Sequence, residues 1–168
     1  HGQLGDGTGS DRSTPTQTAS LGENRTAIAI AVGGRHTCVM LDDPDRETSV
    51  VCWGANEAGQ VGDGTGSDRN SPTQTDTIGA GQAGVGIAAG MSHTCAVLDD
   101  GTVHCWGMSL GIGNGGAQNE FSPVPTETLS PRTAVEIGAG DGHTCVILDD
   151  GSVSCWGSNS HGQLGDGT

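Results

Sequence analysis

The feature that most constrains this chain is an internal repeat. The octapeptide HGQLGDGT occupies residues 1–8 and returns at residues 161–168, and GDGTGSDR at residues 5–12 returns at residues 62–69. The motif HTCxxLDD occurs three times, and each copy is followed by CWG. A chain built in this way folds as copies of one supersecondary unit, in which each copy buries its apolar surface against the next.

The repeat divides the chain into three complete units and a fragment. Unit one covers residues 1–57, unit two residues 58–109 and unit three residues 110–160, and residues 161–168 begin a fourth. Because both ends have the same phase, we expect the two octapeptides to follow the same backbone path. We also expect an unpaired strand edge at each end, and these edges favour association with another unit or another copy.

The local sequence predicts short β-strands joined by tight turns. Residues 87–107 contain two apolar runs on either side of Asp99-Asp100-Gly101, which is the pattern of a β-hairpin. Both faces of the first run carry apolar side chains, so we expect each sheet to be packed between neighbouring sheets. No segment has the apolar spacing of a helix, and the 31 glycines favour turns. The expected fold class is therefore all-β.

The charge of the chain restricts its partners. It has 20 acidic residues against six arginines and no lysine, a net charge of −14, which repels a phosphate backbone and argues against nucleic acid. No apolar stretch is long enough to span a membrane. Aspartates at the hairpin tips should gather on one rim, where they either attract a basic partner or divalent cations, or form an ordinary solvated turn surface. These residues are Asp42, Asp43, Asp99, Asp100, Asp149 and Asp150.

The cysteines form one pair in each unit. Each pair lies symmetrically about a predicted turn, so the two residues should be opposite each other on adjacent strands, within reach of a disulfide bond. The expected bridges are Cys38–Cys52, Cys95–Cys105 and Cys145–Cys155. The alternative is a metal site using the preceding histidine, but the close CxxC spacing and a fourth ligand are absent. Three bridges indicate an oxidising compartment outside the cytoplasm.

The other candidate residues are structural positions or weak ligand sites. We expect the recurring histidines and tryptophans to be structural, with each histidine buried and hydrogen-bonded to a neighbouring loop, because an active site draws different residues from different elements. These positions are His36, His93, His143, Trp53, Trp106 and Trp156. No nucleophile elbow or isolated carboxylate supports an enzyme, and no cofactor is expected.

Two further sites follow from short motifs. The glycine-rich loops offer oxygen ligands for calcium, but aspartates that cap their own turns explain the same residues. The calcium candidates are Asp6, Asp11, Asp63 and Asp68, together with Thr8, Ser10, Thr65 and Ser67. Asn24-Arg25-Thr26 matches a glycosylation sequon.

The repeat unit resembles the regulator-of-chromosome-condensation (RCC1) repeat, in particular the cysteine-bearing versions of secreted bacterial proteins. The resemblance covers all 168 residues. In unit two it rests on Gly59, Gly62, Gly64, Gly90, His93, Leu98, Gly101, Trp106 and Gly107, with their counterparts in the other units. Unit two departs from the pattern at MSLGIGNGG, so the turn after Trp106 should differ.

The resemblance implies a β-propeller in which each repeat supplies a four-stranded antiparallel blade. Closed propellers have four to eight blades, so three units imply a segment of a longer ring, a ring completed by other copies, or an open array. Known members of the family exchange guanine nucleotide on a small GTPase or inhibit β-lactamases, and neither activity has a motif that can be placed here. Two functions remain: a non-catalytic extracellular scaffold for structure, adhesion or assembly, or part of a seven-bladed propeller that binds and inhibits or recruits a protein.

Overall fold

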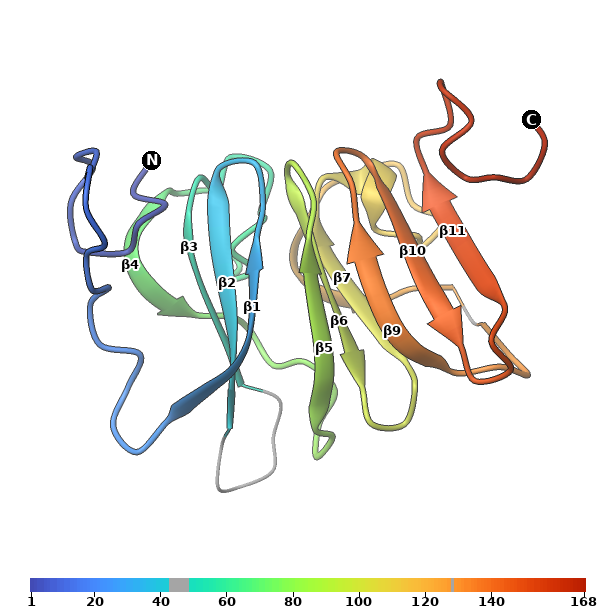
Figure 1. Cartoon of the computed structure of the whole chain (residues 1–168), viewed down its shortest axis with the longest axis horizontal. Helices are drawn as coiled ribbons and strands as arrows, with labels where there is room; N and C mark the ends of the chain where they lie inside the picture. The colour runs from blue at the N-terminus through green and yellow to red at the C-terminus, as the bar shows by residue number, and fades with distance from the viewer. Residues whose placement is uncertain (43–48, 128) are drawn as a thin grey trace.

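The computed structural model describes residues 1–42, 49–127 and 129–168, which form three antiparallel sheets standing side by side (Figure 1). The first sheet contains β1 (Thr26–Val32), β2 (His36–Asp42), β3 (Ser49–Gly54) and β4 (Arg69–Gln74). The second contains β5 (Gly84–Ala89), β6 (His93–Leu98), β7 (Val103–Gly107) and β8 (Glu120–Pro125). The third contains β9 (Ala134–Ala139), β10 (His143–Leu148) and β11 (Val153–Gly157). The structure confirms the all-β fold and the propeller-blade architecture.

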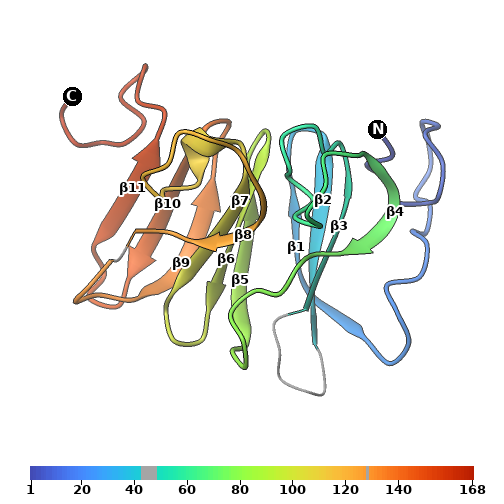
Figure 2. The same cartoon turned by 180° about the vertical axis from the view of Figure 1, so that it is seen from behind.

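Each four-stranded blade takes strands from two consecutive repeat units. The outer strand β4 begins at Arg69 in unit two but pairs with β3 of unit one, and β8 of unit three pairs with β7 of unit two (Figure 2). The blades are four-stranded and antiparallel, as expected, but their boundaries are offset from those of the repeat units by one strand. The third sheet has three described strands. In the repeat, Thr168 is equivalent to Thr65, which lies before Arg69, the first residue of the outer strand β4.

The hairpins have the register that the cysteine spacing predicts. Cys38 lies opposite Cys52, Cys95 opposite Cys105, and Cys145 opposite Cys155. The turn after β6 closes with a hydrogen bond from the Gly101 amide to the Leu98 carbonyl, and Gly101 has a φ of 78°. Such a three-residue turn with a left-handed glycine fits the twist of an antiparallel hairpin.

The apolar core lies between the blades. One cluster joins Met40 and Val50 of the first blade to Leu98 and Trp106 of the second. An equivalent cluster joins Val97 of the second blade to the third. Strands β2 and β6 are buried along nearly their whole length, which agrees with the apolar character of both their faces. Inner strand β5 lies beside both β1 and β9.

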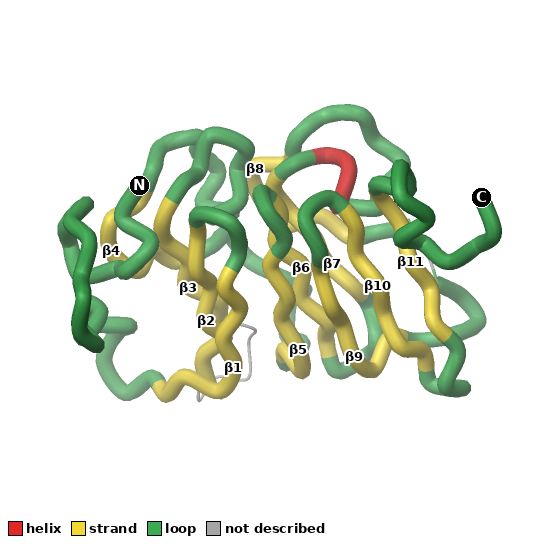
Figure 3. Tube along the Cα trace, turned by 45° about the horizontal axis from the view of Figure 1, so that its top comes forward, coloured by secondary structure: helices red, strands yellow, loops and turns green. Residues whose placement is uncertain are grey.

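The connectors after β3 and β7 reach over the edge of the blades (Figure 3). After β7 the connector contains a 3-10 turn at Ser109–Gly111, which confirms that this turn differs from the others. The two octapeptides follow the same path, as expected. Glycines 2, 5 and 7 have φ angles of 78°, 67° and 82°, and glycines 162, 165 and 167 have 75°, 69° and 88°. None of the described residues forms a helix that is both long and apolar enough to cross a bilayer.

In each connector, one position must be glycine because a tryptophan ring packs against its backbone. Gly62 has a φ of +78°, and a Cβ atom placed on it would lie 2.7 Å from Trp106 Nε1. Gly5 against Trp53 and Gly113 against Trp156 repeat this contact. The indole ring therefore packs directly on the glycine backbone.

We predict that Gly62→Ala lowers the free energy of unfolding by about 3 kcal/mol, because it combines left-handed strain with a steric clash against a buried ring. Gly7→Ala is the matched control, since Gly7 has a φ of +82° and a Cβ atom placed on it would meet nothing within 4 Å. Its cost should be about 1 kcal/mol, from backbone strain alone. Urea unfolding measures both, and equal losses would contradict a role for the tryptophan contact.

Candidate functional site

The recurring histidines link adjacent blades. His36 Nε2 of the first blade lies 2.8 Å from the Thr94 hydroxyl of the second, and His93 Nε2 lies 2.9 Å from the Thr144 hydroxyl of the third. Both histidines are fully buried. Their burial was predicted, but the partner is a strand of the next blade and not a loop. We call this contact the histidine–threonine joint.

The hydrogen-bond network determines the state of each histidine in the joint. The Thr94 hydroxyl donates its one proton to the Gln60 carbonyl, 3.0 Å away, so it can only accept from His36. The proton of neutral His36 is therefore on Nε2. Nδ1 of His36 and of His93 has no hydrogen-bond partner among the described residues. A second proton would have to sit on this buried, unpaired nitrogen.

The environment holds both rings neutral. Burial, followed by the charge of His93, lowers the pKa of His36 from 6.5 to about 4. Burial and the charge of His143 lower the pKa of His93 to about 4 as well. A general base is most effective with a pKa near the working pH and within reach of substrate, and neither condition holds here.

The tryptophans use the same acceptor as the threonines. Trp106 Nε1 donates to the Gln60 carbonyl at 3.0 Å, so this one oxygen receives both the indole and the Thr94 hydroxyl. The Gln3 carbonyl serves Trp53 and Thr37 in the first blade, and the Gly111 carbonyl serves Trp156 and Thr144 in the third. Each connector is thereby attached to the blade it covers.

Neither the threonine of the joint nor the role of Gly90 in it was predicted from the sequence, which indicated Gly90 only as a repeat position. The threonine follows the histidine in every HTC motif, and this recurrence was the available signal. A Cβ on Gly90 would lie 2.1 Å from His93 Cε1 and 2.4 Å from the Gly140 carbonyl oxygen of the third blade. Because Gly90 has no side chain, the imidazole of His93 and the backbone of the neighbouring blade can both lie against it.

The three predicted disulfides are present in the structure, each with a Cα–Cα distance of 4.1 Å. Cys38–Cys52 and Cys95–Cys105 are completely buried, and each belongs to an apolar cluster between blades. Cys145 and Cys155 lie on the outer side of the third blade and are partly exposed. The bridges therefore face the following blade, next to the joint.

The calcium candidates serve as turn caps. Asp63 Oδ1 accepts bonds from the Thr65 amide and hydroxyl, and Oδ2 is paired with Arg69. Burial raises the pKa of Asp63, but the bonds from Thr65 and Arg69 outweigh it, so the pKa is lowered. In unit one, bonds from Thr8 and then from Arg12 lower the pKa of Asp6 to about 2.

The remaining calcium candidates have different surroundings. Asp68 accepts a bond from the Asn56 amide and lies 2.6 Å from His1 Nδ1, whereas Asp11 is exposed. The described residues include no group of three or more His, Cys, Asp or Glu side chains arranged to hold a metal ion. The described contacts of Asp6 and Asp63 fit self-capping turns.

The end of β2 and the turns that follow β6 and β10 lie along one edge of the blades, at the lower side of Figure 1, and the described tip aspartates belong to these segments. Asp42, Asp99 and Asp149 are exposed, and Asp43 falls outside the described residues. Asp100 and Asp150 accept bonds from the amide and hydroxyl of Thr102 and Ser152, respectively, which lowers the pKa of both carboxyls. They cap their own turns and remain ionised.

Asn24 of the predicted sequon is exposed in the turn before β1, with a φ of 58°. Thr26 of the same sequon is the first residue of β1 and pairs with Asp42.

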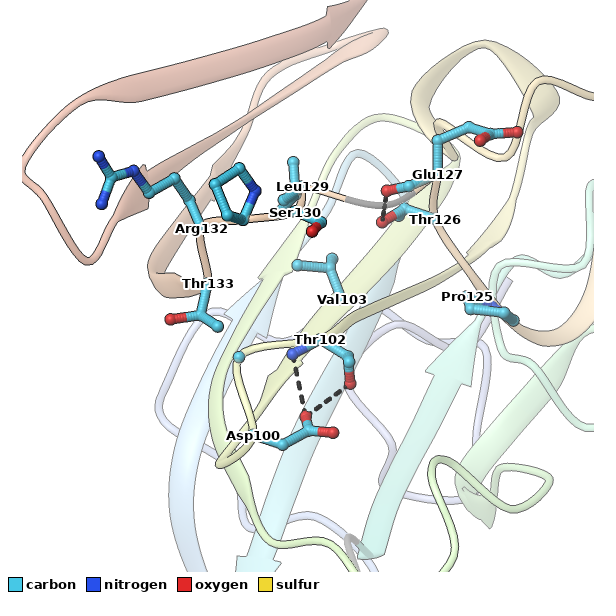
Figure 4. Close-up of a pocket in the computed structure, with 12 residues that line it drawn as sticks. Asp100, Thr102, Val103, Pro125, Thr126, Glu127, Leu129, Ser130, Arg132 and Thr133 are labelled. Atoms are coloured by element: carbon cyan, nitrogen blue, oxygen red, sulfur yellow. Dashed lines mark hydrogen bonds between the residues drawn. The ribbon is translucent and has the colours of Figure 1, made fainter.

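A cavity of about 350 Å³ lies between the β6–β7 turn and the segment that leads to β9 (Figure 4). Val103, Pro125 and Leu129 supply apolar lining. Asp100 is bonded to Thr102, and Arg132, 3.0 Å from Asp150, extends away from the other lining residues. The described lining brings together no nucleophile, base and oxyanion donor.

We predict that the neutral histidines make stability fall with acidification. Their pKa is lower in the folded state, so their contribution is complete above pH 6.5 and is lost as the pH falls towards 4. The loss should be about 2–3 kcal/mol for each histidine. Urea unfolding at a series of pH values measures it. His36→Asn with His93→Asn should flatten the slope over this range, whereas His161→Asn, at an exposed position, should leave it unchanged.

We also predict that native-state reduction is selective for Cys145–Cys155, because thiol exchange requires access to sulfur. Limited reduction followed by alkylation and peptide mapping should label Cys145 and Cys155 about tenfold faster than the other four cysteines. In denaturant the three bridges should react alike. Equal native rates would contradict shielding by the blades.

The sequence is similar to a known repeat family and to several proteins that contain it. The regulator of chromosome condensation (RCC1) repeat matches residues 1–40, 49–97 and 100–147, and a second description of the same repeat matches residues 27–60, 85–110 and 134–163. The ultraviolet-B receptor UVR8 of Arabidopsis thaliana is 34% identical over 117 residues, which are 67% of this chain and 26% of the receptor. The regulator of chromosome condensation of Drosophila melanogaster is 33% identical over 81 residues, or 48% of this chain and 14% of that protein. The chain thus spans about a quarter or less of these relatives.

Solved structures give the same result. Prp20p from Saccharomyces cerevisiae, in a study of its binding to Gsp1p and histones, superposes with a TM-score of 0.69 at 27% identity. The match covers 83% of this chain and 34% of Prp20p. Human WBSCR16, at 23% identity and a TM-score of 0.67, shares the fold. The repeated blades and the family matches together show that the chain belongs to the regulator of chromosome condensation (RCC1) repeat family.

Proposed function

We propose that this chain is a non-catalytic extracellular scaffold whose linked blades present binding surfaces to other proteins. One observation carries the proposal: the recurring reactive side chains are used to connect blades. The six cysteines form three bridges, and His36 and His93 are buried, neutral and bonded to the next blade. A fold that uses these groups for rigidity is suited to recognition.

The proposed extracellular location follows from the bridges. Disulfides persist in oxidising compartments and are rare where glutathione and thioredoxin keep thiols reduced. Each bridge closes a short hairpin that is already paired by backbone hydrogen bonds, with sequence separations of 14, 10 and 10 residues. Its contribution is to hold the hairpin closed against unfolding outside the cell.

The two end blades support assembly with other copies. On the outer side of the third blade, half-buried His143 shares one face of β10 with exposed Ile147, which pairs with exposed Val153. This face corresponds to the half of a joint that faces the next blade. The first blade carries the opposite half, in which the Thr37 hydroxyl donates to the Gln3 carbonyl as Thr94 does to that of Gln60. Head-to-tail contact of these halves would repeat the histidine–threonine contact, with the Gln3 carbonyl in the role that the Gln60 carbonyl has inside the chain. Residues 161–168, which are equivalent to the connector that contains Gln60, would be displaced from that position. Two copies joined at both ends would have six blades, within the range of closed propellers.

A second candidate function is a segment of a larger closed propeller that binds and inhibits or recruits a specific protein. It is favoured by the match to about one third of Prp20p, a protein studied for binding Gsp1p and histones. The number of repeat units in the complete gene product distinguishes the two candidates. About seven units favour a closed ring in one chain.

Ultracentrifugation of the oxidised chain tests assembly. We expect a concentration-dependent dimer or larger species, with dissociation constants raised about tenfold by His143→Ala, since one joint half is lost. Glu57→Ala should have no effect, because Glu57 is exposed in the connector between the first two blades. A strictly monomeric protein with protected amides in both end blades would overturn the assembly proposal.

A further inference from the structure

A row of exposed aliphatic side chains runs across the inner strands of the three blades. Ile28, Val85 and Val135 occupy equivalent positions on β1, β5 and β9, each at an irregularity in pairing with the neighbouring strand. Their exposed fractions are 56%, 56% and 55%. A β-bulge turns a side chain out of the regular alternation, and bulges are frequent beside functional sites. We call these three residues the bulge row.

The exposure of the bulge row is not an effect of the end blades. Val85 lies on the middle blade, which has a neighbour on each side, yet it is as exposed as its counterparts on the outer blades. Two positions further along, Ile30 of the first blade is exposed, whereas Ile87 and Ile137 pack against the clusters between blades. Neighbouring blades therefore cover that second position and leave the bulge row open. Exposed aliphatic residues at three equivalent positions indicate an interaction surface.

The bulge row lies at the edge that carries the tip aspartates. Thr26, two residues before Ile28, pairs with Asp42. The Asp99 amide donates to the Ala83 carbonyl, two residues before Val85, and the Asp149 amide donates to the Thr133 carbonyl, two residues before Val135. Each blade therefore places an aliphatic side chain and an exposed aspartate close together. The spacing repeats from blade to blade.

The negative charge of this edge indicates which kind of segment it can bind. Its exposed carboxylates are those of Asp42, Asp99, Asp100, Asp149, Asp150 and Glu136. Among the described residues near this edge, the arginines are Arg132, which is paired with Asp150, and Arg25, which donates to Gln74, so the six carboxylates outnumber the two guanidinium groups. An acidic surface attracts basic segments and speeds their association, and apolar contacts then provide the short-range affinity.

We propose that the bulge row and the tip aspartates form a docking surface for a basic, aliphatic-rich segment of a partner protein. Leucine, isoleucine or valine side chains of the segment contact Ile28, Val85 and Val135, and its lysines and arginines pair with the aspartates. This proposal rests on the proposed binding function and specifies the face and the chemistry of the partner.

A peptide of alternating lysine and leucine is the probe, and fluorescence anisotropy with the oxidised chain measures its binding. Val85→Ser with Val135→Ser should weaken binding about tenfold, and Asp99→Asn with Asp149→Asn should do the same. Binding should also decrease with added salt, because the charged groups are exposed. A lysine–serine peptide should bind about tenfold more weakly than the lysine–leucine peptide.

Matched controls separate this surface from the general negative charge. Glu57→Gln with Asp141→Asn removes the same charge from exposed residues in other loops, and Met91→Ser with Leu110→Ser removes comparable exposed apolar groups. Both control pairs should bind like the unmodified chain, and thermal unfolding should show that all variants are folded. No binding to the unmodified chain, equal losses in the controls, or equal binding of the lysine–serine peptide would overturn the proposal. If the chain assembles but does not bind the peptide, only the docking surface is overturned. If the chain binds the peptide but does not assemble, the assembly proposal is overturned and the docking surface stands.

Discussion

The hydrogen-bonded joint between blades is the constraint on which the rest of the structure depends. A threonine hydroxyl donates to a connector carbonyl and accepts from the histidine of the preceding blade, so three segments distant in sequence meet at one oxygen. Burying these groups without partners would cost about 1–3 kcal/mol each. The joint therefore fixes the position of each blade relative to the next, which apolar packing alone does less specifically.

Several other features exist to accommodate this joint. Gly33 and Gly90 lie where any Cβ would strike both the imidazole and a carbonyl of the next blade. The tryptophan shares the carbonyl used by the threonine and lies on the backbone of Gly62 or its counterpart. The buried disulfides pack in the same interfaces. Glycine, tryptophan and cysteine thus recur together because they fill one crowded space.

Variation between the units occurs away from the joint. In the connector after β3, Asp63 forms an ion pair with Arg69. In the connector after β7, the equivalent positions instead form a hydrogen bond from the side-chain amide of Asn114 to Glu120. On the edge opposite the tip aspartates, equivalent positions carry Gly34, Met91 and Asp141. The bulge row, in contrast, has Ile28 and two valines at equivalent exposed positions. A surface property that recurs without a packing reason is consistent with recognition of another molecule.

The sequence by itself determined the repeat, the all-β class, the hairpin register and the cysteine pairing. These properties depend on local spacing, because a symmetric turn places Cys95 opposite Cys105 whatever surrounds the hairpin. The burial of His36 and His93 could also be predicted from their recurrence. Only the tertiary structure decided what they bind, which unit supplies the outer strand, and which aliphatic residues stay exposed. Thr94 meets His36 across 58 residues, and the exposure of Val85 depends on a bulge between strands and on the reach of neighbouring blades. Such contacts form between separate blades, and spacing within one unit carries no information about them.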